Sequence, residues 1–463
     1  MKLTLINPPP FRKVEKWDIP DYPQVGTGYL ASSLRKAKIT DFTIIDAKLE
    51  RLNIKDVLKR VKDLSPNIVG LSAMTHEIGQ AAIIANEIKK SLPICKIIIG
   101  GVHLSAIPED TMKSFKVFDL GLIGEAEKTL PNLMDCLSNE GNLSKICGLI
   151  HWDNGNLIKN LPASVPEELD SIPFPAWDLF PKAKEYPLLY TRGCPFKCNF
   201  CMRFHGDKVR SRSPENLVEE MEKIVLDYSP KEFWFIDETF GLYKKNVFAL
   251  MDLIQKKKLH SKTKWWAATR VSVATFELLD KMKESGCYKV GFGIESGNET
   301  ILKNSKKNMS IKKSISLIDY CKKIGMLTEA YFIIGHPCET RKTIKDTINL
   351  SVRLNADITA FGIMVPYPKT EIFDMVQKGE GNYKLISTNW GDYNKQIGGA
   401  IELKNITRSE LEFWQIWAYL KVFISNRRYK ELVVTMLKFR KAAYTLVKKQ
   451  VKSFLKLNAQ VSR

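Results

Sequence analysis

Two runs of alternating strand and helix patterns, separated by a proline-rich segment, set the strongest limit on how this chain can fold. In the first run, short β-rich segments alternate with amphipathic helical segments. The predicted strands are 3–7, 42–46, 67–72, 96–100 and 120–123, and the predicted helices are 28–36, 54–64, 77–91 and 126–137. Because a strand, a helix and a second parallel strand form a right-handed crossover, this order predicts an α/β fold with a parallel, doubly wound, Rossmann-like sheet.

A second alternation follows residues 161–178, whose four prolines neither a helix nor a central strand would tolerate. Its predicted strands are 188–191, 232–236, 264–268, 289–294, 328–334 and 358–365. Strand–helix units of this kind form either an open sheet or a partial barrel, and periodicity alone does not separate the two. We therefore expect a first domain of residues 1–150, a linker of 151–183, a second α/β domain of 184–400 and a basic helical region of 401–463.

The charge of the chain bears on its partners rather than on its fold. It carries 71 lysines and arginines against 51 acidic residues, a formal net charge of +20, and much of the excess lies in residues 401–463. Such a balance attracts phosphates, nucleic acid or anionic lipid. No stretch approaches the roughly 18 to 20 apolar residues of a spanning helix, and the proline-broken start is too short for a secretory signal, so we expect a cytoplasmic protein.

Three of the nine cysteines stand close together, at Cys194, Cys198 and Cys201, directly after a predicted strand. Thiolates at this spacing reach one metal centre without long-range folding, and soft sulfur ligands select zinc or an iron–sulfur cluster. A zinc site needs a fourth ligand, for which His205 is the nearest candidate. An iron–sulfur cluster with three cysteines leaves one iron open to a non-protein ligand. The other cysteines are scattered and are expected to pack as small apolar side chains.

Polar and small residues stand at the carboxyl ends of the later predicted strands, which in a barrel would face its mouth. An acidic pair there would accept hydrogen bonds from an ammonium group, an arginine fork suits a carboxylate, and a glutamate suits ribose hydroxyls. Each of them taken alone is also consistent with a helix cap or a solvated turn. The residues are Asp237 and Glu238, then Arg270, then Glu295 and Ser296, and then Gly335 and Pro337.

The cysteine loop, with Phe200 immediately before its last cysteine, resembles that of the radical S-adenosylmethionine (radical SAM) superfamily, and the motifs above follow in the family's order. The resemblance implies that Cys194, Cys198 and Cys201 hold a 4Fe-4S cluster, with S-adenosylmethionine on its fourth iron. Reduction by one electron then cleaves the sulfonium to a 5'-deoxyadenosyl radical. The strand-end residues and Phe200 are expected to bind S-adenosylmethionine, with Gly335 and Pro337 near the adenine.

The first domain is similar to the cobalamin-binding domains that precede radical SAM barrels in one large subgroup. The matching positions are 7–10, 26–30, Asp46, 99–103 with Gly100 and Gly101, and 124–127. Glycines at strand ends let a flat ligand approach the backbone. The Asp-x-His-x-x-Gly motif is absent, since the string at His76 lacks the aspartate. We therefore expect cobalamin to bind with its dimethylbenzimidazole tail displaced and no histidine beneath the cobalt, unless the domain is a scaffold without cofactor.

Together these resemblances predict a cobalamin-dependent radical SAM enzyme that methylates an unactivated carbon. The same motifs serve cyclisation, oxidation or carbon–carbon bond formation in lipid, tetrapyrrole or natural-product biosynthesis. A third hypothesis, a non-catalytic zinc or cobalamin binding module with a basic tail, leaves the ordered strand-end residues without a role.

The implied partners are a small-molecule or lipid-like substrate and an electron donor such as flavodoxin or ferredoxin, and nucleic acid is not expected. Residues 427–457 have the pattern of a basic amphipathic helix. Such a helix either contacts an anionic membrane surface or packs on the barrel.

Overall fold

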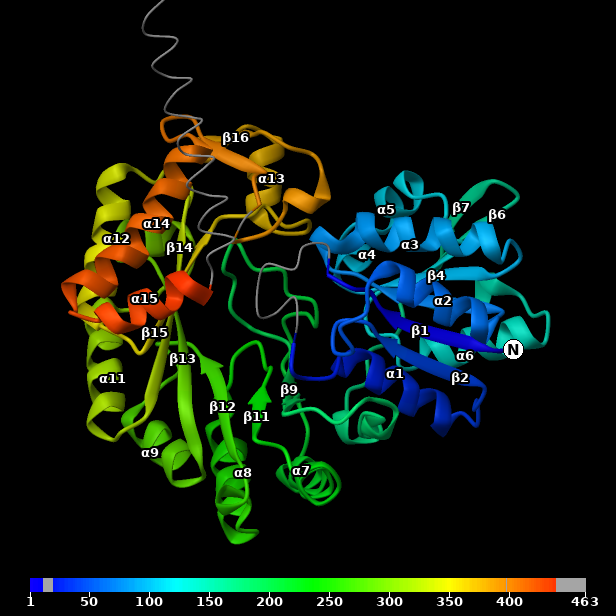
Figure 1. Ribbon diagram of the computed structural model, residues 1–463, viewed down its shortest axis with the longest axis horizontal. Helices are drawn as coiled ribbons and strands as arrows, with labels where there is room; N and C mark the ends of the chain where they lie inside the picture. The colour runs from blue at the N-terminus through cyan, green and yellow to red at the C-terminus, as the bar shows by residue number, and fades with distance from the viewer. Residues whose placement is uncertain (11–19, 397, 439–463) are drawn as a thin grey trace, which may run out of the picture. The chain divides into compact units, whose positions relative to one another are not determined.

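The computed structural model describes residues 1–10, 20–396 and 398–438 (Figure 1). The chain divides into two compact units. The first comprises Met1–Pro195 and Met202–Trp266, and the second comprises Phe196–Cys201 and the chain from Ala267 onward. The division does not follow the expected domain boundary near residue 184, because the first strands of the second sheet belong to the first unit.

The first sheet contains seven strands in the order β2-β1-β3-β4-β5-β6-β7. They are β1 (Leu3–Asn7), β2 (Phe42–Asp46), β3 (Ile68–Ser72), β4 (Lys96–Gly100), β5 (Leu120–Leu122), β6 (Leu149–Asp153) and β7 (Asn156–Lys159). Strands β1 to β5 pair in parallel, as the alternation predicts. Chain order reverses between the neighbours β1 and β3, which makes this pair the topological switch point.

Helices cover both faces of this sheet (Figure 1). They are α1 (Val25–Lys36), α2 (Ile54–Leu64), α3 (Ile78–Ser91), α4 (Val102–Ala106), α5 (Pro108–Ser114) and α6 (Thr129–Ser138). Helices α1 and α6 pack together, and α2 packs on α3. With both faces covered, the central strands are apolar along their length; in β4, Ile97, Ile98 and Ile99 are all buried.

The sheet extends to Lys159, beyond the expected boundary at residue 150. Strands β6 and β7 add an antiparallel hairpin to the edge at β5. The two turn residues, Asn154 and Gly155, both have positive φ, at 47° and 81°. Asn-Gly is a preferred pair in two-residue hairpin turns. The sequence therefore contained a local signal for this hairpin, although the periodicity of helices and strands did not indicate it.

The second sheet contains six strands in the order β15-β14-β13-β12-β11-β8. They are β8 (Glu185–Leu188), β11 (Glu232–Phe235), β12 (Lys264–Thr269), β13 (Cys287–Glu295), β14 (Leu327–Ile334) and β15 (Ile358–Ile363). The order is sequential, and the chain passes from the first unit to the second within β12. Right-handed crossovers between sequential parallel strands place the helices on one face, which is the arrangement of a partial barrel rather than of a doubly wound sheet.

The helices that alternate with these strands are α7 (Pro214–Tyr228), α8 (Lys244–Lys256), α9 (Phe276–Glu284), α10 (Glu299–Asn304), α11 (Ile311–Lys323), α12 (Arg341–Leu354) and α13 (Glu371–Gln377). Most begin at side-chain caps; the hydroxyls of Ser213, Ser310 and Thr340, for example, accept hydrogen bonds from the first turns of α7, α11 and α12.

The first barrel strand differs from its expected range of 188–191. Strand β8 ends at Leu188, and Thr191–Arg192 form a separate short strand, β9, paired with β10 (Arg210–Ser211). The reason is a hydrogen-bond partner outside the sheet: the backbone N–H groups of Tyr190 and Thr191 donate to the carboxylate of Asp237, at 2.9 and 3.0 Å.

The C-terminal part of the described chain is not wholly helical. Strands β16 (Tyr383–Leu385) and β17 (Ile401–Leu403) form an antiparallel pair, and α14 (Arg408–Ser425) and α15 (Tyr429–Lys438) follow. The predicted basic helix of 427–457 is helical over α15; residues 427–428 lie just before that helix, and 439–457 lie outside the described residues. None of the helices in the described ranges combines the length and apolarity that crossing a membrane requires.

We expect Ile97→Ala in β4 to lower the free energy of unfolding by about 2 to 5 kcal/mol, because it opens a cavity in a fully buried position. The matched control is Ile94→Ala, three positions earlier, where the side chain is 92% exposed and little change is expected. Urea unfolding followed by circular dichroism measures both. Equal midpoints for the two variants would contradict the buried position of β4.

Candidate functional site

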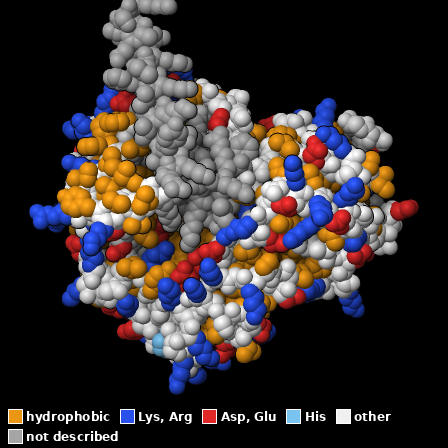
Figure 2. Space-filling model, in the orientation of Figure 1, with side chains coloured by type: hydrophobic (Ala, Val, Ile, Leu, Met, Phe, Trp, Pro, Cys, Tyr) orange, Lys and Arg blue, Asp and Glu red, His pale blue; other side chains and the backbone are white. Residues whose placement is uncertain are grey.

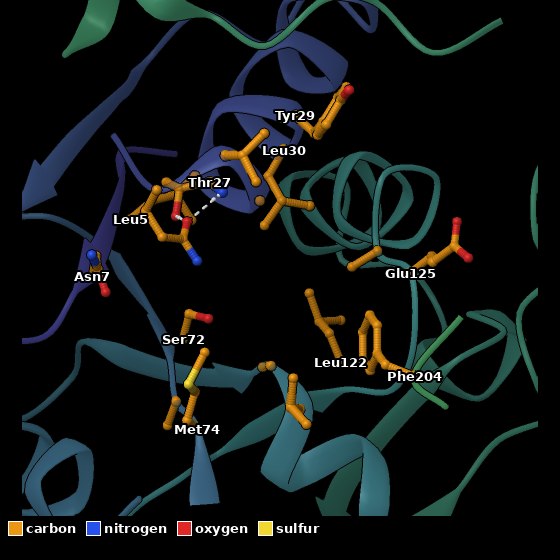
Figure 3. Close-up of a pocket in the computed structure, with 18 of the residues that line it drawn as sticks. Leu5, Asn7, Thr27, Tyr29, Leu30, Ser72, Met74, Leu122, Glu125 and Phe204 are labelled. Carbon is orange, nitrogen blue, oxygen red and sulfur yellow. Dashed lines mark hydrogen bonds between the residues drawn. The ribbon is translucent and has the colours of Figure 1, made fainter. Parts of the chain in front are cut away.

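A cavity of about 540 Å³ lies at the switch point of the first sheet (Figure 3). Its floor is formed by the carboxyl ends of β1, β3, β4 and β5, at Asn7, Ser72, Gly100 and Leu122. The start of α1 forms another wall, where Gln24 Oε1 accepts a hydrogen bond of 2.6 Å from the backbone N–H of Thr27. Open α/β sheets bind ligands at this edge.

The remaining wall comes from the start of the second α/β domain, within the same unit. Its residues are Leu189, Arg192, Phe204, His205, Ile236 and Glu238. Figure 3 shows Phe204 on the side of Leu122 and Glu125, across the cavity from Asn7. The cavity therefore brings the sheet edge of the first domain together with the loops that flank the first two barrel strands.

Gly100 and Gly101, predicted to bind cobalamin, both line the cavity, and glycine is needed at the two positions for different reasons. Gly101 has a φ of +96°, and a Cβ there would stand 2.7 Å from the carbonyl oxygen and 2.9 Å from the nitrogen of Ala73. At Gly100 a Cβ would meet nothing nearer than the Leu122 oxygen at 4.0 Å. Gly101 is thus required for the close approach of β3 and β4, and Gly100 leaves a flat backbone surface open to a ligand.

Asp46 is not among the residues that line the cavity. It is buried at the end of β2, where its carboxylate accepts hydrogen bonds from Asn7 Nδ2 at 2.7 Å and from the Gln24 backbone at 2.9 Å. Burial raises the pKa of Asp46 above its usual range, despite these hydrogen bonds. Asp46 therefore holds two lining residues, Asn7 and Gln24, in place.

A charged group that sequence reasoning missed lies on the side of β2 and β3. Lys48 and the buried Glu77 form an ion pair, and His76 Nε2 lies 3.8 Å from Glu77 Oε1; all three line the cavity. Burial by itself would raise the pKa of Glu77, but the Lys48 ammonium outweighs it, so the pKa is lowered. Glu77 is therefore a carboxylate, and it gives the cavity a polar corner.

The first part of the cysteine loop belongs to the first unit. Gly193 has a φ of +98°, and a Cβ there would stand 2.3 Å from the Lys208 oxygen, so only glycine fits before Cys194. Its N–H donates to Glu238 at 2.8 Å, and Cys194 Sγ lies 3.6 Å from the Thr239 hydroxyl. The acidic strand end and the first cysteine are thus neighbours.

The two residues of the predicted acidic pair, Asp237 and Glu238, have different surroundings. Asp237 is buried, accepts three hydrogen bonds from Tyr190 and Thr191, and has its pKa raised to about 7 by burial. Glu238 lines the cavity and pairs with His205 Nδ1 at 2.8 Å. Burial would raise the pKa of Glu238, but the contact with His205 outweighs it and the pKa is lowered.

Cys198 and Cys201 lie in the second unit, where Arg270 reaches the first of them. Arg270 Nη1 donates a hydrogen bond of 3.0 Å to Cys198 Sγ, Nη2 donates to the Lys307 carbonyl, and the guanidinium lies 3.9 Å from the Phe196 ring centroid. The sulfur of Cys198 therefore has a buried cation beside it. Arg270 was predicted to bind S-adenosylmethionine, because an arginine fork suits a carboxylate; in the structure it bonds to Cys198 and to the Lys307 carbonyl.

Glu295 and Ser296 follow β13 with different surroundings. Glu295 has a φ of +66° and forms a buried ion pair of 2.8 Å with Lys307, a partner that the sequence did not indicate. Burial would raise the pKa of Glu295, but Lys307 outweighs it and the pKa is lowered. Ser296 is fully buried, and its hydroxyl bonds to Thr347 and accepts from the Asn298 N–H, so it shapes the turn into α10.

Gly335 and Pro337 form the turn after β14, and a buried carboxylate holds this turn. Glu339 accepts hydrogen bonds from the N–H groups of Gly335 and His336, and the Tyr383 hydroxyl donates to the Gly335 carbonyl at 2.9 Å. Gly335 has a φ of +86°. In the same unit the predicted cofactor residue Phe200 packs edge-to-face on His336, with centroids 5.9 Å apart. Phe200 therefore joins this turn to the cysteine loop.

Across the described ranges, no group of three His, Cys, Asp or Glu side chains stands ready to hold a metal ion as placed. The cysteine loop is shared between the two units, so the cluster assignment rests on its spacing and on the donor chemistry around it. Three thiols, one of them beside Arg270, fit an iron–sulfur cluster. His205, the candidate fourth zinc ligand, uses Nδ1 for Glu238.

Comparison with known proteins agrees with this arrangement. The model of the radical SAM superfamily matches residues 188–351, and that of the B12 binding domain matches residues 20–134. An uncharacterized methyltransferase of Pyrococcus horikoshii is 33% identical over 434 residues, which cover 92% of this chain and 93% of that protein. The chain therefore belongs to the radical SAM superfamily, in the branch whose members carry a B12-binding domain ahead of the radical SAM domain.

Two further relatives show the range of this branch. An anaerobic magnesium-protoporphyrin IX monomethyl ester cyclase of Cereibacter sphaeroides is 26% identical over 84% of this chain, which spans 65% of the cyclase. The solved structure of the radical S-adenosylmethionine methyltransferase TsrM from Kitasatospora setae, with cobalamin and a [4Fe-4S] cluster, superposes with a TM-score of 0.70 at 18% identity. The superposition covers 85% of this chain and 81% of TsrM and shows that the fold is shared.

The buried carboxyl of Glu339 makes stability depend on pH. Burial raises its pKa from 4.5 to about 8, so the folded protein holds this proton more tightly than the unfolded chain. The stabilisation that this pKa difference gives the folded protein is complete below the pKa of the unfolded chain, and it is lost as the pH rises toward 8. We expect Glu339→Gln, which keeps an acceptor for the two N–H groups, to flatten this fall between pH 5 and 8 in urea unfolding. Glu284→Gln, at an exposed position, is the control, and parallel pH profiles for wild type and Glu339→Gln would contradict the assignment.

Proposed function

We propose that this protein is a cobalamin-dependent radical SAM methyltransferase that transfers a methyl group to an unactivated carbon of a small-molecule or lipid-like substrate. One observation carries the proposal: a single cavity is walled both by the strand ends of the B12-binding domain and by residues of the radical SAM domain. A cavity of this kind lets two cofactors act on one substrate. The names of the relatives, methyltransferases and a cyclase, agree with this class of chemistry.

Cys194, Cys198 and Cys201 hold the cluster in this proposal, and the strand ends of the first domain hold cobalamin. When bound, the cluster and S-adenosylmethionine supply hydrogen-atom abstraction, and methylcobalamin supplies the methyl group. Gly100 provides the flat edge on which a large ring can rest, and Gly101 lets β3 and β4 approach each other beside it. Arg270 holds the side chain of Cys198 in place through the hydrogen bond to Sγ.

The acidic residues take roles that follow from their hydrogen bonds. Glu238 is ionised and lines the cavity, so it is the acceptor we assign to the methionine ammonium. Asp237 has its oxygens occupied by the backbone at 190–191 and therefore positions the start of the cysteine loop. Glu295, fixed by Lys307, is assigned to the ribose hydroxyls of S-adenosylmethionine.

The apolar part of the cavity wall serves to exclude water. Leu5, Ile6, Leu30, Leu122 and Ile236 are among the side chains that form it. A reactive carbon is protected from side reactions only in a site that water leaves. This distribution suits radical chemistry on an apolar part of a substrate.

Metal content tests the cofactors directly. Protein purified anaerobically and reconstituted with iron, sulfide and cobalamin is expected to hold about four irons and one cobalt per chain. The triple variant Cys194→Ala, Cys198→Ala, Cys201→Ala is expected to lose the iron and to keep the cobalt. Zinc in place of iron would support a binding module instead, and iron without cobalt would mean that the first domain is a scaffold.

The fate of S-adenosylmethionine separates methylation from cyclisation. A methyltransferase of this kind uses two molecules per turnover, one as methyl donor and one as radical source, so S-adenosylhomocysteine and 5'-deoxyadenosine should both form with a substrate. The required electron is assigned to a flavodoxin or ferredoxin. Deoxyadenosine without S-adenosylhomocysteine or a methylated product would contradict methylation and favour the cyclase-like alternative.

We also propose that α14 and α15 contact an anionic membrane surface. Large apolar side chains are exposed along both helices: Phe413, Trp417, Ile424, Tyr429, Val433, Val434, Met436 and Leu437. Figure 2 shows hydrophobic side chains gathered over this region, with lysine and arginine beside them. The exposed Arg427 and Lys430 give the face a positive charge, which complements anionic lipid headgroups.

Sedimentation with vesicles tests this contact. The full chain is expected to bind phosphatidylglycerol vesicles and not phosphatidylcholine vesicles, and Arg427→Glu with Lys430→Glu should weaken binding by about fivefold or more for each charge removed. Lys303→Glu with Lys312→Glu, at exposed positions elsewhere in the same unit, is the matched control. Equal binding by both double variants, or self-association that Val433→Ser with Leu437→Ser abolishes, would contradict a lipid surface as the partner.

A further inference from the structure

A network of four buried charges joins the loop after β5 to the strand that leads into the cysteine loop. Arg192 Nη1 donates to Glu125 at 2.6 Å, and its Nη2 lies 2.7 Å from Glu127. Arg210, which is paired with Arg192 in register, also reaches Glu125 and donates to the Pro166 carbonyl at 2.8 Å. The side chains are between 2% and 10% exposed, and two arginines balance two glutamates.

This network does more than neutralise charge, because it belongs to the cavity wall. Arg192, Glu125 and Glu127 all line the cavity, and the Arg192 guanidinium lies 5.0 Å from the ring centroid of Tyr29, another lining residue. A ligand that fills the cavity therefore meets this guanidinium and its carboxylates. Their position depends on the loop after β5, which in turn is held by the Gly124 N–H bond to Ser105 at 2.9 Å.

The same arginine sits two residues before Cys194. The backbone of Gly193, which lies between them, is fixed by its left-handed φ, by the nearby Lys208 oxygen and by the hydrogen bond to Glu238. Cys194 N–H then donates to the Gly206 carbonyl at 3.1 Å. A small shift of Arg192 is thus transmitted along a short, rigid stretch of backbone to the first cysteine.

We propose that Arg192 is a positioning residue that links the occupancy of the cavity to the placement of Cys194, so that binding of cobalamin and binding of the cluster strengthen each other. The inference rests on the proposed function and adds a coupling between its two cofactor sites. One bidentate guanidinium bridges Glu125 and Glu127; a lysine at this position keeps the charge but cannot span both carboxylates. The coupling is reciprocal, since linkage acts equally on both ligands.

The test compares cobalamin affinity with and without the cluster. Cobalamin is titrated into the anaerobic full chain, with the cluster reconstituted or with iron removed by a chelator, and the visible spectrum reports binding. We expect wild type to bind cobalamin at least about fivefold more tightly when the cluster is present. Adding cobalamin should also change the electron paramagnetic resonance spectrum of the reduced cluster.

In Arg192→Lys the two affinities are expected to become equal, and the resonance spectrum of the cluster should no longer respond to cobalamin. Glu127→Gln, which leaves the contact of Arg192 with Glu125, should reduce the coupling in the same direction and serves if the lysine variant does not fold. Arg35→Lys is the matched control, because Arg35 forms a comparable two-bond pair with Asp178 in the same unit, exposed and outside the cavity wall.

Two results would overturn the inference: wild type that binds both cofactors with no coupling, or Arg192→Lys that keeps the full coupling. Wild type that retains neither iron nor cobalt is a different failure, since it contradicts the proposed function and removes the coupling with it.

Discussion

The site depends on one constraint: a charge that is buried must be paired or hydrogen-bonded. The carboxyl groups of Asp46, Asp237 and Glu339 are all nearly inaccessible, and each accepts hydrogen bonds from backbone N–H groups. Leaving such a group without partners would cost several kcal/mol. The strand-end loops are therefore held by buried carboxyl groups whose pKa burial raises, whereas the ionised carboxylates of the site are Glu77, Glu238 and Glu295.

This constraint separates residues that face a ligand from residues that hold the site. Glu238 and Asp237 are adjacent, yet one lines the cavity and the other anchors the backbone before the cysteine loop. The ion pairs Glu295–Lys307 and Lys48–Glu77 likewise keep carboxylates ionised in apolar surroundings. Removing one partner of a buried ion pair destabilises a protein much more than replacing both partners. Such pairs therefore specify the geometry of the site more than they stabilise the fold.

Local pattern was enough to predict both sheets, because parallel strands that alternate with helices leave a clear periodicity. Strands β1, β2 and β4 were predicted to the residue, and the cysteine loop was found from its spacing. The strand order was not predictable in this way, since periodicity carries no information on neighbours. The break between β8 and β9 and the ion pair of Glu125 with Arg192 also depended on contacts between residues far apart in the chain, whereas the β6–β7 hairpin and the hydrogen bonds of Glu339 are local.

The sequence by itself determined the kind of chemistry: three thiols in one loop, glycines at strand ends, and an ordered series of polar strand ends. These are short-range properties, because each needs only a few neighbouring residues and a strand before them. Only the tertiary structure decided which of these polar groups face the cavity and which form the hydrogen bonds that hold the surrounding loops in place. That decision depends on burial and on hydrogen bonds between separate segments, as Asp46 and Arg270 show, and residue type alone does not encode it.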